Sequence, residues 1–149
     1  MLIEVLTQIY ERDLTKLKAE IEQYRSDADI WQVAGEVVNS GGNLCLHLCG
    51  NLRHFIGFVL GGSGYVRDRE LEFSDTNISR DELMTRIDAT LDEVKASLAK
   101  LTAEDLEKEY PIDVFGHSMT TAYFITHLAT HFNYHLGQIN YHRRLISAA

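Results

Sequence analysis

Three histidines near the C-terminal end of the chain, His127, His131 and His135, follow one another at intervals of four residues. Their segment has the apolar spacing of a helix, and residues four apart lie on one helix face, about one turn or ~6 Å along the axis. The neutral imidazole ring is the commonest protein ligand for divalent transition metals. The spacing therefore predicts part of the coordination sphere of a metal ion.

Geometry limits how many of these rings can share one ion. Two neighbouring histidines can, but a ring two turns away lies too far along the axis for metal–nitrogen bonds of ~2.0–2.1 Å. Two of the three would therefore bind, and another helix must supply the remaining ligand. The segment 46–55 offers His47 in an apolar context, where an imidazole needs a partner, and His54 on nearly the same face.

Two other interpretations of the histidines need no metal. A histidine-rich helix can be a solvated polar edge, or its rings can be core residues that bind backbone carbonyls. His142 extends the same pattern by seven residues, whereas His117 lies in a glycine-flanked turn and is expected at the surface.

The apolar pattern elsewhere predicts long helices, since the chain has only one proline. We expect four, over residues 2–24, 43–60, about 80–101 and about 118–146. Helices that must each bury one apolar stripe pack together, so the fold class is all-α, a four-helix bundle. The length of 149 residues suits a single domain, 1–149.

The connections show their own signals. Glycine, serine and asparagine at 39–43 predict a turn that caps the second helix, and Ser79 with Glu82 fits a capping box for the third. We expect an ordered, irregular linker over 65–77 and a small extended or hairpin segment over 107–117. Cys45 and Cys49 are expected to be buried thiols, with a metal or redox role as the alternative.

Charge and hydropathy exclude some functions. The formal net charge is −8, which argues against a nucleic-acid-binding surface. No apolar run reaches the roughly 18–20 residues that span a bilayer, and charge follows the start too soon for a signal peptide. We expect a cytoplasmic protein with no membrane or nucleic-acid partner.

Three stretches together resemble the DinB-like (DinB/YfiT-like) superfamily of metal-dependent bundle proteins. They are NSGGNLCLHLCGNLRHFIG at 39–57, YVRDRELEF at 65–73 and HLATHFNYHLGQI at 127–139. The resemblance covers essentially the whole chain in length and helix order, and the third stretch is the most specific. It implies a four-helix bundle with a divalent metal held by His47, His131 and His135. His127 would line the pocket or support the ligands.

The resemblance also implies an activity. Characterised relatives include metal-dependent transferases that join bacillithiol or mycothiol to electrophiles, and a mycothiol-dependent maleylpyruvate isomerase. The expected function is a thiol S-transferase with a small-molecule thiol and an electrophilic substrate, acting as a homodimer. Alternatives are a hydrolase that uses metal-bound water and a non-enzymatic, stress-related binding protein. Imidazole ligands suit several metals, with zinc or nickel expected first.

Overall fold

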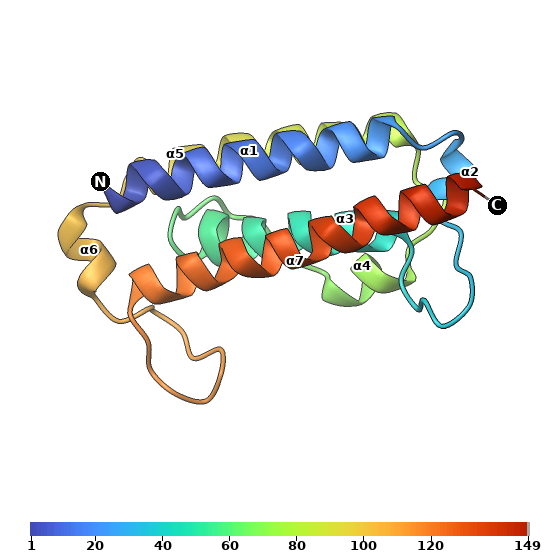
Figure 1. Cartoon of the computed structure of the whole chain (residues 1–149). Helices are drawn as coiled ribbons and strands as arrows, with labels where there is room; N and C mark the ends of the chain where they lie inside the picture. The colour runs from blue at the N-terminus through green and yellow to red at the C-terminus, as the bar shows by residue number, and fades with distance from the viewer. Residues whose placement is uncertain (149) are drawn as a thin grey trace.

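The computed structural model describes residues 1–148, and its elements are helices. Their bounds are α1 Leu2–Glu22, α2 Asp27–Ile30, α3 Gly41–Leu52, the π-helix η1 Arg53–Phe58, α4 Arg69–Ser74, α5 Arg80–Leu98, α6 Ala103–Glu107 and α7 Thr121–Ala148. Figure 1 shows α1, α3, α5 and α7 as the long, roughly aligned members. The prediction of an all-α bundle with four long helices is confirmed.

The predicted apolar stripes form the core. On α5 the apolar residues Leu83, Ile87 and Leu98 are buried. On α1 the apolar residues spaced three or four apart are buried as well: Leu6, Tyr10, Leu14, Leu17 and Ile21. One cluster joins these side chains to those of α3 and α7. Burial of these faces is the main force that holds the bundle together, because each helix alone would expose its stripe to water.

Polar contacts between helices show how the chain runs through the bundle. Glu11 and Lys18 of α1 bind Lys95 and Asp88 of α5, so these two helices are antiparallel. Asp13 and Glu20 of α1 bind Asn133 and Asn140 of α7, so α1 and α7 run in the same direction. His47 of α3 meets His131 of α7 while Phe55 meets Phe124, which makes α3 and α7 antiparallel.

Because α3 and α5 run the same way, the chain must return along the bundle between them. The returning segment, residues 59–79, includes α4, which packs on α3 (Figure 1). The prediction of an irregular linker over 65–77 was wrong at this point. Asp68 caps a short helix by accepting a hydrogen bond from the backbone N–H of Leu71, a local bond that supports one and a half turns without an apolar stripe.

The second long helix is divided into two parts. Ser40 caps α3 by accepting from the N–H of Asn43, as expected for this turn. At Arg53 the α-helix widens into η1, where the N–H of Val59 bonds to the carbonyl of His54, five residues back. A π-helical turn is rare and frequently marks a functional site.

The predicted hairpin before the last helix is a loop closed by a single antiparallel bridge between Glu109 and Thr120. The hydroxyl of Tyr110 donates to the carbonyl of Phe55 and ties the base of this loop to η1.

Of the capping box predicted at Ser79, only the serine half forms, since the side chain of Glu82 binds Arg86 instead. No helix of the described residues is long and apolar enough to cross a membrane.

Truncation of the core should cost much more stability than truncation of the same helix at its surface. Leu14 is fully buried, so Leu14→Ala should lower the free energy of unfolding by about 2–5 kcal/mol through lost contacts and a cavity. Val5 of the same helix is 46% exposed, and Val5→Ala should change it by less than about 0.5 kcal/mol. Urea unfolding followed by circular dichroism measures both, and equal losses would contradict this packing.

Candidate metal centre

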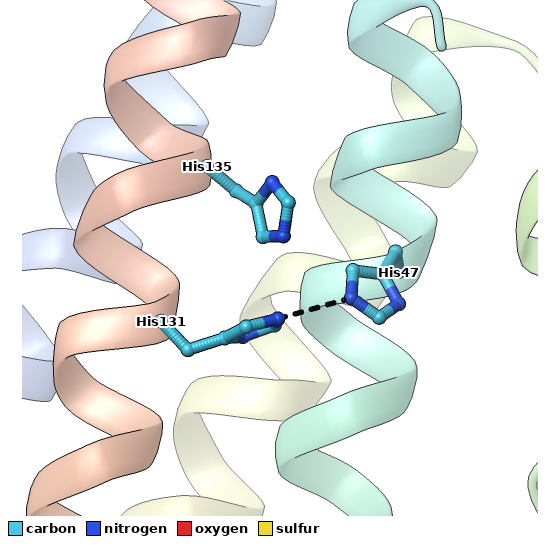
Figure 2. A group of neighbouring side chains, drawn as sticks. All are labelled: His47, His131 and His135. Carbon is cyan, nitrogen blue, oxygen red and sulfur yellow. Dashed lines mark hydrogen bonds between the residues drawn. The ribbon is translucent and has the colours of Figure 1, made fainter. Parts of the chain in front are cut away.

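Three histidine side chains converge between α3 and α7. His47 comes from α3, and His131 and His135 come from successive turns of α7 (Figure 2). One ring nitrogen from each lies within 4.8 Å of the others. Nε2 of His47 and Nε2 of His131 are 3.3 Å apart. The structure thus brings together the three histidines named by the resemblance, close enough to bind one metal ion.

Neighbouring side chains orient two of the rings. Nδ1 of His47 lies 3.0 Å from Oε1 of Glu72, and Nδ1 of His135 lies 2.7 Å from Oε1 of Gln138. Each of these oxygens is an acceptor, so each Nδ1 carries the hydrogen. The lone pair is then on Nε2, the nitrogen used by metal-bound histidine when Nδ1–H has such a partner.

The Glu72 carboxylate is itself held firmly. It is 5% exposed and accepts two hydrogen bonds of 2.8 Å from Nε and Nη2 of Arg67. Burial by itself would raise the pKa of Glu72, but the bonds from Arg67 and His47 outweigh it and the pKa is lowered. Glu72 is therefore an anion that can only accept, which keeps the hydrogen of His47 on Nδ1.

The two α7 rings at the centre, those of His131 and His135, favour the neutral form. Burial, with the positive charge of neighbouring histidines and Arg67, lowers the pKa of His131 to about 4. Burial likewise lowers the pKa of His135, although its bond to Gln138 acts in the opposite direction. Metal binding requires deprotonated imidazole, so these rings are ready donors without the loss of a proton.

The donor set fits a transition metal ion. Tetrahedral bonds of ~2.0–2.1 Å place two ligand nitrogens about 3.3 Å apart, which is the spacing of His47 and His131. Without a shared cation or proton, two inward lone pairs at this distance would repel. Nδ1 of His131 is buried and has no partner among residues 1–148. Three nitrogen ligands leave a position open, as in catalytic rather than closed structural sites.

The other histidines have different surroundings. His127 lines a pocket beside the centre and contacts the ring of Phe115. His54 lies on η1 and stacks on Phe58. His142 is a core residue whose two nitrogens meet the hydroxyl of Tyr24 and the carbonyl of Gln32, each at 2.7 Å.

The sequence also predicted an exposed His117 and two buried thiols, Cys45 and Cys49. His117 is exposed, as expected for its turn. Cys45 and Cys49 are free, buried thiols, which confirms the preferred interpretation of this pair. Both cysteines lie outside the group of nitrogen atoms at the centre.

Sequence reasoning missed the residues that support the ligands. The linker 65–77 is visibly rich in charge, but nothing in its pattern singles out Glu72 as the acid that turns inward. Arg67 and Glu72 are five apart, a spacing that neither a helix nor a strand predicts. Gln138 belongs to the quoted motif, yet its bond to His135 became visible only in the structure.

Comparisons with known proteins agree with this fold. The chain matches, over residues 3–149, the family described as a protein of unknown function, DUF1572, and it belongs to that family. A conserved protein from Enterococcus faecalis is similar in structure, with a TM-score of 0.80 at 15% identity over 98% of this chain and 97% of the other. A DinB-like protein from Bacillus cereus has a TM-score of 0.76 at 17% identity, over 97% and 92%. No curated protein matches.

These similarities define the class of protein. The arrangement of helices is the DinB-like fold, so the resemblance found in the sequence is confirmed at the level of the fold. The described relatives carry no stated activity, and a shared fold does not by itself fix the chemistry of a site.

A glycine substitution tests how tightly Glu72 is held. A Cβ at Gly50 would lie 2.0 Å from Oε2 of Glu72, so Gly50→Ala must push the carboxylate off Arg67 and His47. We expect it to lower the free energy of unfolding by about 1–3 kcal/mol, although alanine favours a helix over glycine.

The control is Gly137→Ala on α7, where a Cβ has no atom within 4 Å. This variant should be as stable as the wild type or more stable by up to about 1 kcal/mol. Urea unfolding of both variants gives the comparison. A gain in stability for Gly50→Ala would contradict a rigid contact between Gly50 and Glu72.

Proposed function

We propose that this protein is a metal-dependent enzyme whose His47, His131 and His135 hold one divalent ion, with zinc or nickel as the first candidates. The observation that carries the proposal is the set of three ring nitrogens within 4.8 Å of one another. The orientation of His47 by Glu72 and of His135 by Gln138 supports it, because such partners fix the tautomer that a metal needs.

We further propose thiol S-transfer as the reaction. An ion at this centre, when bound, would lower the pKa of a thiol and hold it as thiolate, the form of sulfur that attacks an electrophilic carbon. Side chains around the centre form the pocket and orient the ligands. Phe55 and Phe124 wall the adjoining pocket, while Arg67 and Glu72 support His47 behind the site.

A thiol held as thiolate would need no carboxylate base from this pocket. The residues that line it include no aspartate or glutamate, within the part of the chain that the structure describes. Glu72 contacts the centre from behind and is committed to Arg67 and His47. A nucleophile that is already an anion requires no base at the moment of attack.

Metal content is the first test. Wild-type protein purified without a histidine tag should contain about one divalent transition ion per chain by elemental analysis. Glu72→Gln should weaken metal affinity by about 10–100-fold, and His131→Ala by more, since it removes a ligand rather than a supporting partner. The exposed His117→Ala is the control and should bind as the wild type does. Substoichiometric metal in the wild type, or equal affinity in His131→Ala, would overturn the proposal.

Activity is the second test. With a reactive electrophile and several low-molecular-weight thiols, the metal-loaded wild type should accelerate thioether formation, and His131→Ala should reduce this to the uncatalysed rate. Turnover that does not depend on added thiol would favour hydrolysis instead. Equal rates for wild type and His131→Ala would contradict the proposed transferase activity. Metal binding without any turnover would indicate a binding protein.

A further inference from the structure

A pocket of about 220 Å³ adjoins the three histidines. His47 and His131 line one side of it, so a molecule in the pocket can reach the open side of the centre. The rings of Phe55, Phe115 and Phe124 also line it, and the Phe124 ring contacts those of Phe55 and Phe115, with centroids 5.1 and 5.8 Å apart. Its volume is below the ~300–1,000 Å³ of sites for drug-sized ligands, so the occupant is compact.

The lining of this pocket is positive, although the chain as a whole is negative. The chain has a formal net charge of −8, yet the charged side chains that line the pocket are Arg67 and Arg69. Among the described residues, no carboxylate belongs to that lining. A local positive patch in a negative protein attracts an anion to one place and leaves the remaining surface repulsive to it.

The two arginines differ in what they already bind. Arg67 is committed to Glu72 through two hydrogen bonds. Arg69 is exposed and forms no hydrogen bond or ion pair within residues 1–148. Its guanidinium stacks over Phe73 at 5.3 Å, and Phe73 also contacts the ring of His47 at 4.9 Å. Arg69 is therefore held near the centre with its donors free.

Two further polar groups face the same pocket without partners. Asn51, one turn after His47 on α3, is 7% exposed, and its Oδ1 is buried with no hydrogen bond to the described residues. The ring nitrogens of His127 likewise form none there, although the ring itself packs against Phe115. A buried amide oxygen without a partner is costly, and only a ligand group that donates a hydrogen bond to it would remove that cost.

We infer that this pocket binds a compact carboxylate, with Arg69 as the group that recognises its charge and His127 as a further hydrogen-bond partner. The inference rests on the proposed function, because it places this carboxylate on the thiol or the electrophile that reacts at the centre. The planar fork of a guanidinium matches the two oxygens of a carboxylate. One free arginine suits a single negative charge, and the aromatic wall suits a short carbon chain.

A matched pair of thiols tests the inference. The probes are 3-mercaptopropionate and 3-mercaptopropionamide, which share a thiol and a carbon chain and differ in charge. Titration calorimetry with metal-loaded wild type should show the carboxylate binding at least about tenfold more tightly. Arg69→Gln should abolish this preference and leave amide binding unchanged, while Arg69→Lys should retain part of it.

Arg144→Gln is the control, because Arg144 also stacks over an aromatic ring, Tyr141, but lies outside the pocket. It should keep the full preference, and elemental analysis should show unchanged metal content in all three variants. Equal affinity of wild type for the two thiols, or a preference that survives in Arg69→Gln, would overturn the inference alone. Failure of wild type to bind metal or either thiol would overturn the proposed function with it.

Discussion

The close approach of two imidazole nitrogens, Nε2 of His47 and Nε2 of His131 at 3.3 Å, is the constraint on which the rest of the site depends. Two neutral rings cannot direct lone pairs at each other at this distance unless a proton or a cation lies between them. Burial keeps the His131 ring neutral, and Glu72 places the hydrogen of His47 on the far side of its ring. The Nε2 atoms of the two rings thus face each other at a distance that a shared metal ion would also require.

That arrangement requires an anion in the interior, and the topology supplies it. The chain returns along the bundle between the parallel helices α3 and α5, and this return brings Arg67 and Glu72 against α3. A buried carboxylate is costly unless it is paired and fully hydrogen-bonded. Glu72 satisfies both conditions, because Arg67 binds both of its oxygens and His47 binds one. The glycine at position 50 provides the space that this carboxylate occupies.

The similar structures share 15% and 17% identity with this chain at TM-scores of 0.80 and 0.76. A fold maintained at such low identity depends on the apolar pattern of its helices rather than on particular residues. The chemistry is a separate matter, since one fold can hold sites of different function. In this chain the Arg69 side of the pocket has a charge opposite to that of the whole protein.

The sequence by itself determined the four long helices and the buried faces of α1 and α5. Apolar residues three or four apart, such as Leu6, Tyr10 and Leu14, follow the 3.6-residue period of a helix and show which face is buried. It also limited the metal pair to neighbours on one helix. The resemblance to the DinB-like superfamily then named His131 and His135 as that pair and His47 as the third ligand.

Only the tertiary structure decided what surrounds those rings. Glu72 and Arg67 approach His47 from a segment 20 to 25 residues further along the chain, through a short helix that local pattern did not predict. Asn51 and Arg69 face the same pocket from different elements. Such contacts depend on the path of the chain between parallel helices, and no local periodicity encodes that path.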